Sequence, residues 1–183
     1  GYAILAVGSI NGNEGLSAHT LTANNVYRHL VNRNFTLVDN PTDFWDDPLD
    51  HIKYYNPDGS VQPGEDSIAT DGPSYPQAMQ KAITEWALAK MWAMPGPLYI
   101  TLINHGEPDK FFLSDPNYVT PTELNTWLTY LENELAVRGV PVQPIIITLG
   151  MCHSGSFIDE LSRNDARSKR IILAASANNE PSY

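Results

Sequence analysis

Short, continuous apolar runs recur along the chain and are separated by longer segments of mixed polarity. Three of them are Tyr2 to Val7, Leu98 to Ile103 and Ile145 to Leu149, and a fourth is Ile171 to Ala174. None of the four contains a charged residue. Runs of this length, without polar alternation, are typical of strands buried on both faces, as in parallel sheets. The pattern therefore predicts four buried strands.

Between these runs, apolar residues recur three or four positions apart, which is the spacing of one helix face. The first such segment predicts a helix over about Ser17 to Asn32. A second helix should end near Ala93. Ser74, with Gln77 three residues later, predicts a capping box at the start of this second helix.

The third helical segment has the clearest start signal in the chain. Thr120, Pro121 and Glu123 supply an N-cap hydroxyl, a proline suited to the first helical position and a capping-box acid. A shorter helix is expected around Phe157 to Leu161. A hairpin is expected around Phe111 to Leu113.

Two stretches in the first half of the chain complete the prediction. Phe35 to Val38 predicts a second strand after the first helix. Residues 40–72 are rich in proline, aspartate, glycine and asparagine and show no sustained period. Because so long an irregular segment is usually functional or disordered, we expect a lid or rim there.

The alternation of strands and helices predicts an α/β fold with a parallel sheet and helices on both faces. In open sheets of this kind, ligands bind beyond the carboxyl ends of the strands. Asn104-His105-Gly106 follows one predicted strand, and Met151-Cys152-His153 follows another. The candidate chemistry therefore falls where the architecture expects a site.

Length, charge and cysteine content narrow the class of protein. One domain spanning residues 1–183 fits the 42% hydrophobic content. The formal net charge of -10 argues against nucleic acid or an anionic membrane as a partner, because both require clustered cations. No apolar run approaches the roughly 20 residues of a membrane span. A single cysteine cannot form an internal disulfide.

Cys152, the only cysteine, lies between a predicted strand and a turn of small residues. A thiol attacks as the thiolate, and the N-terminus of the helix expected after Cys152 would favour that form. The alternative is a buried structural cysteine, since free cysteine is among the most buried residue types. A position at a strand end, beside glycine and serine, favours the nucleophile.

His105 is the matching acid-base candidate, because imidazole titrates near neutrality and can protonate a departing amine. A surface histidine without a catalytic role is the alternative. Gly106 would let a substrate approach closely, and its N–H could join that of Cys152 in binding an oxyanion. His153 should point to the opposite side and have a structural role.

A metal site is the weaker interpretation. Cys152, His153 and His105 lack the recurrent spacing of zinc ligands. Calcium prefers hard oxygen donors, but the acidic residues of the long irregular segment lack EF-hand spacing, which favours a solvated acidic loop. These residues are Asp43, Asp46, Asp47, Asp50, Asp58, Glu65, Asp66 and Asp71.

Taken together, "ITLINHGE" and "ITLGMCHSGSF" resemble the legumain-like cysteine peptidases, relatives of caspases and gingipains, and especially their bacterial members. The resemblance covers nearly the whole chain. In that family one strand ends in His-Gly, a later strand ends in Cys-x-Ser-Gly-Ser, and the next leads to an Asn-x-x-x-Ser-Tyr-like segment. The matching segments here are His105-Gly106, Cys152 to Ser156 and Asn178 to Tyr183.

The resemblance implies a three-layer α/β/α caspase-like (caspase-hemoglobinase) fold with a mainly parallel sheet and a Cys152–His105 dyad. Cys152 would attack a peptide carbonyl, forming a thioester, while the N–H groups of Gly106 and Cys152 bind the oxyanion. This implies a cysteine endopeptidase that needs no metal or organic cofactor. A polar residue of the first loop would orient His105, and Asn11 and Asn13 both qualify.

The family comparison also implies a substrate pocket around Ser182, Gly150 and His19. Gly150 stands where legumains have an acidic residue, and Ala18-His19 stands where they have Arg-His, which argues against asparagine specificity. The family's sheet continues with another strand. The resemblance therefore implies that residues 1–183 are the N-terminal, catalytic part of a longer domain subject to autoprocessing.

The implied partners are a peptide or protein substrate and a C-terminal fragment of the same precursor. Export to the periplasm or out of the cell is compatible with the bacterial resemblance. Two alternatives stay open at this point. One is a transpeptidase or ligase of the same family, in which an amine resolves the thioester. The other is a catalytically inactive caspase-like module that binds without turnover.

Overall fold

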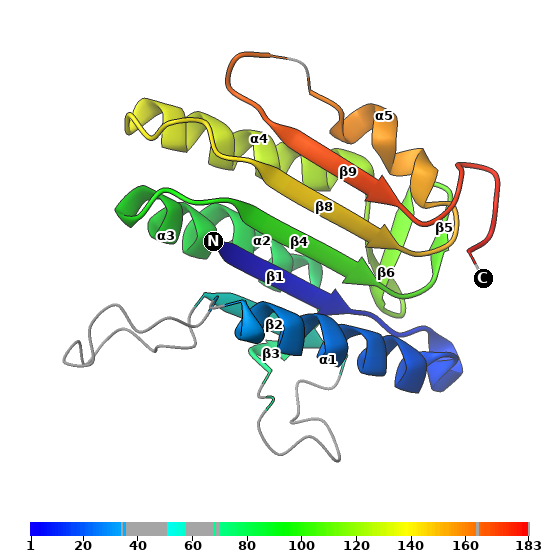
Figure 1. Cartoon of the computed structure of the whole chain (residues 1–183). Coiled ribbons are helices and arrows are strands. Elements are labelled where there is room, and N and C mark those ends of the chain that lie inside the picture. The colour runs from blue at the N-terminus through cyan, green and yellow to red at the C-terminus, as the bar shows by residue number, and fades with distance from the viewer. Residues whose placement is uncertain (34, 36–50, 58–67, 69, 164, 183) are drawn as a thin grey trace.

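A six-stranded parallel sheet forms the centre of the protein (Figure 1). The computed structural model describes residues 1–33, 35, 51–57, 68, 70–163 and 165–182. The strand order is β3-β2-β1-β4-β8-β9. The bounds are β1 (Tyr2–Val7), β2 (Ile52–Asn56), β3 (Gly72–Pro73), β4 (Leu98–Ile103), β8 (Ile145–Gly150) and β9 (Arg170–Ala174). The parallel sheet predicted from the apolar runs is therefore confirmed.

A second, antiparallel sheet lies beyond the carboxyl end of β4. It consists of β5 (Gly106–Glu107), β6 (Lys110–Ser114) and β7 (Asn117–Val119). The predicted hairpin around Phe111 to Leu113 is confirmed. Because β5 begins at Gly106, this small sheet holds the chain directly after His105.

Helices cover both faces of the main sheet, which gives three layers (Figure 1). Helix α1 (Leu16–Asn32) packs on one face, where it meets Ala3, Leu5 and Val7 of β1. The alternate residues of β1 face a second core, because successive side chains of a strand point to opposite sides. That core is formed with α2 (Pro76–Lys81), the π-helical turn η2 (Ala82–Ala87), α3 (Leu88–Ala93), α4 (Pro121–Val137) and α5 (Ile158–Leu161).

The start of α4 follows its sequence signal, whereas the start of α2 does not. Thr120 caps α4, accepting from the N–H of Glu123, whose carboxylate accepts from Thr120 in return. The capping box predicted at Ser74 is wrong. The N-cap of α2 is Tyr75, which makes no capping hydrogen bond, and the buried Ser74 hydroxyl instead donates to the carbonyl of Val7 at 2.6 Å.

Strand β2 corrects the expectation of an irregular lid over residues 40–72. It pairs with β1 and carries the fully buried Tyr54, whose hydroxyl donates to Asn24 Oδ1 on α1 at 2.8 Å. The run Ile52 to Asn56 is short and has polar neighbours on both sides, so the sequence pattern does not indicate a strand there. The predicted strand from Phe35 falls, apart from Phe35 itself in a turn, outside the described residues, as does most of the acidic segment.

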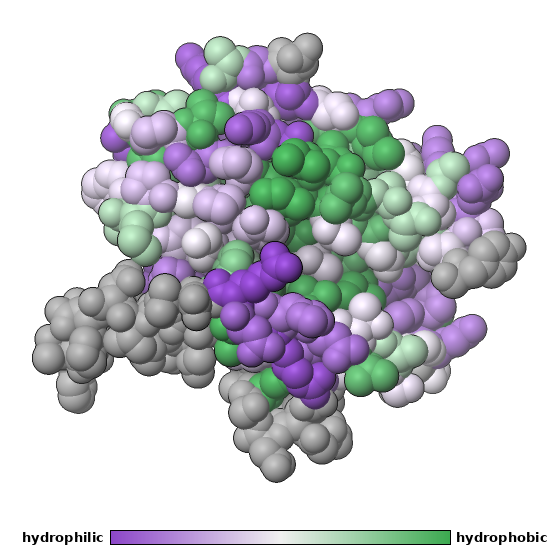
Figure 2. All heavy atoms as spheres, in the orientation of Figure 1, coloured by the Kyte–Doolittle hydropathy of each residue, from purple (hydrophilic) through white to green (hydrophobic). Residues whose placement is uncertain are grey.

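Strand β9 is present as predicted, but it is not buried on both faces. It is the edge strand, and Ile171 and Leu173 are 47% and 52% exposed. Helix α1 packs against β1 and β2 and does not reach this edge. Figure 2 shows the resulting hydrophobic area on the α1 side of the sheet. Only the opposite face of β9, with Ile172, joins the core.

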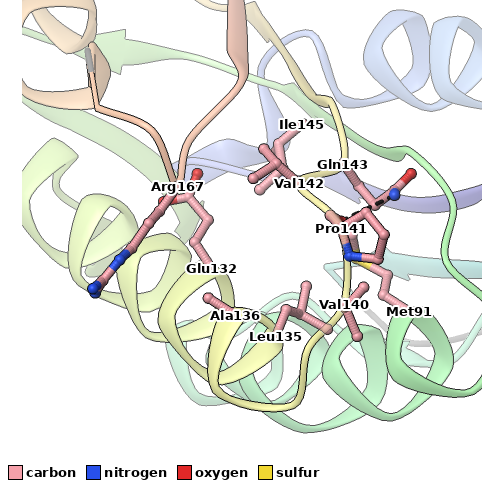
Figure 3. A pocket seen from close by; sticks show the side chains of 10 residues that line it. All are labelled: Met91, Glu132, Leu135, Ala136, Val140, Pro141, Val142, Gln143, Ile145 and Arg167. Atoms are coloured by element: carbon pink, nitrogen blue, oxygen red, sulfur yellow. Dashed lines mark hydrogen bonds between the residues drawn. The ribbon is translucent and has the colours of Figure 1, made fainter.

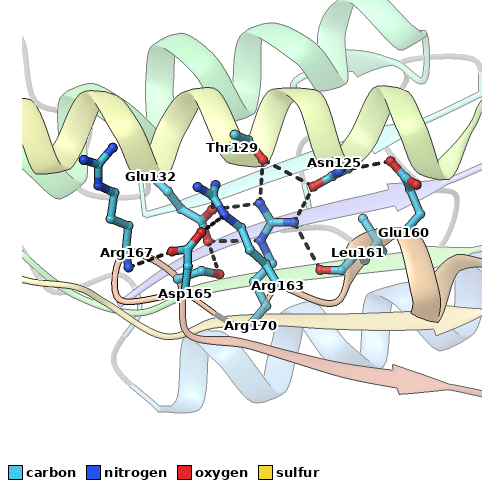
Figure 4. Close-up of polar contacts among 10 residues, drawn as sticks. Asn125, Thr129, Glu132, Glu160, Leu161, Arg163, Asp165, Arg167 and Arg170 are labelled. Carbon is cyan, nitrogen blue, oxygen red and sulfur yellow. Dashed lines mark hydrogen bonds and ion pairs between the residues drawn. The ribbon is translucent and has the colours of Figure 1, made fainter.

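A buried ionic network attaches β9 to α4 (Figure 4). The side chain of Arg170 is 1% exposed and donates to both carboxylate oxygens of Glu132, at 3.0 and 2.7 Å. Arg163 donates to the same carboxylate at 3.0 Å. Arg170 also donates to Asn125 and Thr129 on α4. These bonds satisfy the buried charge and fix the start of β9 against the helix layer.

Candidate active site

His105 and Cys152 occupy equivalent positions after two neighbouring strands. In the β4–β8 pair, Ile103 lies opposite Gly150, and each candidate residue follows two positions later. The ladder extends one step further, because the N–H of Asn104 donates to the carbonyl of Gly150 at 3.2 Å. Adjacent strands are about 4.8 Å apart. His105 and Cys152 thus leave the same edge of the sheet on neighbouring strands.

Gly106 lies against the backbone that carries the thiol. A Cβ at this position would lie 2.6 Å from the carbonyl oxygen of Cys152 and 2.9 Å from Cγ of Met151. Only glycine allows so close an approach. The N–H of Cys152 makes no hydrogen bond to any described residue, so it is free to bind an oxyanion. Gly106 and Cys152, the two predicted oxyanion donors, are therefore neighbours in the structure, and their role stays a prediction.

The thiol of Cys152 lies in a polar and partly accessible environment. Cys152 is half-buried, and its Sγ accepts from the N–H of Ser182 at 3.3 Å and from the Ser182 hydroxyl at 3.6 Å. Ser182, predicted as a pocket residue, is thus in direct contact with the sulfur. A cysteine sealed within hydrocarbon, the structural alternative, does not describe this position.

The loop after Cys152 is tied to residues 176–180 by backbone and side-chain contacts. His153 has a left-handed φ of 57°, its N–H donates to the carbonyl of Glu180, and its ring Nδ1 bonds to the carbonyl of Asn178. Ser154 is fully buried against Ser176. These contacts give His153 a structural place in the loop. The thiol's position therefore depends on the segment that follows β9.

The helix expected after Cys152 is shorter than its electrostatic role requires. One 3-10 turn, η3 (Ser154–Phe157), runs into α5, which has 4 residues. A helix macrodipole grows from aligned peptide units and acts over the terminal turn. So short a segment supplies little of it, and the expectation that a helix N-terminus favours the thiolate of Cys152 is wrong.

His105 is oriented by a backbone carbonyl. Its Nε2 lies 3.0 Å from the carbonyl oxygen of Glu14, in the turn between η1 (Asn11–Asn13) and α1. A carbonyl only accepts, so Nε2 carries the hydrogen, and in the neutral ring Nδ1 keeps its lone pair. The sequence indicated Asn11 or Asn13 for this role. The side chain of Asn13 is outside the described part, and either asparagine stays a prediction.

His19, predicted as a pocket residue, lies against His105. The two ring centroids are 5.1 Å apart at 74°, an edge-to-face arrangement. Burial lowers the pKa of His19, and the nearby His105 lowers it further, while the Asn104 side chain raises it. The third predicted pocket residue, Gly150, is half-buried at the end of β8, where a Cβ would lie 3.3 Å from the carbonyl oxygen of Leu102.

Two groups at the site were not predicted from the sequence, the carbonyl of Glu14 and the side chain of Asn104. The carbonyl of Glu14 could not be recognised, because any residue supplies a carbonyl. The side chain of Asn104 could have been suspected from its place before His105. It is 3% exposed, and its Nδ2 donates to the carbonyl of Phe112 at 2.8 Å.

One pocket of the described structure is remote from this chemistry. A small pocket lies at the amino end of β8, between α3 and α4, with mostly aliphatic walls (Figure 3). Its carboxylate, Glu132, is already bound by Arg163 and Arg170. No cluster of three or more metal-binding side chains occurs among the described residues. Of the acidic segment, Asp71 is described and pairs with Lys53.

Comparison with known proteins adds no assignment. No protein-family model matches the chain, and no curated protein matches it. Among the described helices, none combines the length and apolar character needed to cross a bilayer. What the fold itself defines is an α/β protein with a mainly parallel sheet and a candidate thiol–imidazole site at the carboxyl edge.

Proposed function

We propose that this protein is a cysteine endopeptidase with a caspase-like fold, and that Cys152 and His105 form its dyad. The observation that carries the proposal is their equivalent placement after the paired strands β4 and β8. The His-Gly and Cys-x-Ser-Gly-Ser motifs, which resemble those of legumain-like peptidases, support it. The contacts of Gly106 with the backbone of Cys152 support the oxyanion site.

The reaction begins with transfer of the thiol proton to Nδ1 of His105. The thiolate attacks the carbonyl carbon of the peptide, and the oxygen takes the negative charge between the N–H groups of Gly106 and Cys152. The C–N bond then breaks, and the leaving amine takes the proton from His105. A thioester remains on Cys152.

Water completes the cycle. His105, now neutral, accepts a proton from the attacking water, and a second tetrahedral intermediate forms at the same oxyanion site. The C–S bond breaks, the acid product leaves, and the proton returns to the sulfur. The carbonyl of Glu14 holds Nε2–H throughout, so that Nδ1 is the nitrogen that exchanges protons.

The test is hydrolysis of a diverse library of quenched fluorescent peptides, together with labelling by a thiol-directed peptidyl probe. Cys152→Ala and His105→Ala should abolish turnover, while His29→Ala, an exposed histidine of α1 far from the sheet edge, should leave it unchanged. Added amine separates hydrolysis from transpeptidation through the products. Turnover by Cys152→Ala at the rate of the parent, or no turnover by the parent, contradicts the proposal.

A further inference from the structure

Two buried polar atoms beside His105 lack a regular hydrogen bond. In the described ranges three buried side-chain atoms have no partner: His19 Nδ1, Asn104 Oδ1 and Asn133 Oδ1. Asn133 lies on α4, away from the sheet edge. The other two belong to the immediate surroundings of the imidazole. Buried polar groups are nearly always paired, so an exception of this kind needs a reason.

Asn104 is held in place by three contacts, one of its backbone and two of its side-chain amide. Its backbone N–H donates to Gly150, and its Nδ2 donates to Phe112. Gly8 packs against it so closely that a Cβ there would lie 2.4 Å from Nδ2. Because Nδ2 is the donor to Phe112, Oδ1 is the atom left without a partner, and the Asn104 side chain lies close enough to His19 to raise its pKa. Oδ1 can act only as an acceptor.

His19 is positioned between this amide and His105. It lies in the first turn of α1, where its backbone N–H donates to the carbonyl of Gly15. Gly15 has a φ of 70°, and a Cβ on it would lie 2.8 Å from Cε1 of His19 and 3.4 Å from Nε2 of His105. Gly15 is therefore close to both rings, and a side chain there would collide with His19.

We propose that His19 and Asn104 are positioning residues for His105. The inference rests on the proposed function. The ring of His19, with Nδ1–H directed at Oδ1 of Asn104, packs edge-to-face on His105. It thereby keeps Nε2–H of His105 on the carbonyl of Glu14 and Nδ1 available to the thiol. The two unpartnered atoms are a complementary donor and acceptor.

The charge state of His19 agrees with this role. The groups that face it are His105 and the neutral amide of Asn104, and burial together with the positive charge of His105 lowers its pKa. His105 must become an imidazolium during the reaction. A second cation 5.1 Å away would oppose that step. A neutral His19 supports the ring without competing for the proton.

The kinetic test compares His19→Ala, His19→Phe and Asn104→Ala with the control His29→Ala. Amide substrates need a proton for the leaving amine, whereas activated esters do not. His19→Ala should lower kcat for an amide about 10- to 100-fold with little change in KM, and it should affect an activated ester much less. His19→Phe, which keeps the ring contact, should recover part of the loss. Equal losses for amide and ester, or no recovery by phenylalanine, would overturn the proposal.

A measurement that needs no turnover separates the two proposals. Long-range 1H–15N spectra of the imidazoles should show a single Nε2–H tautomer for neutral His105 in the parent. They should also show contacts between the ring protons of His19 and His105. His19→Ala should mix the tautomers while the melting temperature stays near that of the parent. An unchanged His105 spectrum in His19→Ala refutes the positioning role, even if the peptidase proposal holds, and an inactive parent with the expected spectra refutes only the peptidase.

Discussion

The two halves of the candidate site are held in different ways. His105 is held by parts of the chain that precede it or lie next to it. These are the carbonyl of Glu14, the ring of His19, the side-chain amide of Asn104 and the small antiparallel sheet that begins at Gly106. Cys152 and the loop after it are held by a later segment, residues 176–182, through backbone groups and through the side chains of His153, Ser154 and Ser176.

This difference predicts which substitutions each half of the site should tolerate. On the histidine half, the side chains of His19 and Asn104 make contacts beside the carbonyl of Glu14, so replacing either side chain should be felt there. On the cysteine half, the shorter contact with Sγ comes from the backbone N–H of Ser182, so the hydroxyl at that position should matter less. The path of the chain after β9 should matter greatly, because it delivers Ser182 to the sulfur.

The largest expected effect concerns the anchor of β9, the strand that leads into residues 176–182 on the cysteine half. Arg170→Ala would leave the carboxylate of Glu132, 5% exposed, without its main partner. Removing one member of a buried ion pair costs about 3–5 kcal/mol of folding free energy. Urea denaturation should show that loss. Arg167→Ala, an exposed arginine of the same loop, should change stability by less than about 0.5 kcal/mol. Similar losses of stability in Arg170→Ala and Arg167→Ala would mean that the ionic network in Figure 4 does not attach β9 to α4.

The next effect concerns Gly106, where the two halves meet. A Cβ in Gly106→Ala would lie 2.6 Å from the carbonyl oxygen of Cys152, so the backbones that carry the imidazole and the thiol must shift. A displacement of about 1 Å can lower the rate of a reaction about 100-fold, and overpacking costs about 1–3 kcal/mol.

The matched control for this prediction is Gly96→Ala. A Cβ there would make ordinary contacts at 3.6 Å or more, so activity and stability should stay close to those of the parent. Peptide hydrolysis and urea denaturation of the two variants measure both effects. Full activity in Gly106→Ala would show that the halves are not in contact at this point.

The sequence predicted the scaffold well where a pattern depends on burial alone. The strands at Tyr2, Leu98 and Ile145 and the capping box of α4 match the structure, because continuous apolar runs and cap residues are local signals. Strand β2 was missed because Ile52 to Asn56 is brief and polar residues surround it. The exposed face of β9 was missed because a run of apolar residues does not tell which neighbours will cover it.

The site shows the same division. Cys152 and His105 could be proposed from strand ends, since paired parallel strands end at one edge. The carbonyl of Glu14 could not, because backbone contacts leave no mark on residue identity. The packing of His19 on His105 also required the structure, because it depends on how α1 enters after a turn of three residues. Long-range side-chain contacts on the histidine half are therefore what the sequence conceals.

A smaller effect tests whether the cysteine half relies on backbone rather than side chain. Ser182→Pro removes the N–H that donates to Sγ at 3.3 Å, whereas Ser182→Ala removes only the hydroxyl at 3.6 Å. A hydrogen bond to a charged group contributes about 1.5–3 kcal/mol, so the proline variant should slow alkylation of Cys152 at neutral pH about tenfold or more. The alanine variant should slow it less than about twofold. The reverse order would assign the contact to the side chain.

The smallest effect is the contribution of His19 to the pH dependence of stability. Its pKa is lowered in the folded protein from the usual 6.5, chiefly by burial, so the unfolded chain binds more protons between the two values. The contribution of neutral His19 to the free energy of unfolding is therefore complete above about pH 6.5, and it decreases as the pH falls from 6.5 through the lowered pKa. In His19→Phe this loss of stability should disappear. On acidification the free energy of unfolding of the variant should therefore rise relative to that of the parent. Urea midpoints of the two proteins at neutral and acidic pH measure it, with the other titrating groups common to both. A difference independent of pH would mean that His19 keeps its ordinary titration in the folded state, and that the histidine half is less enclosed than its contacts indicate.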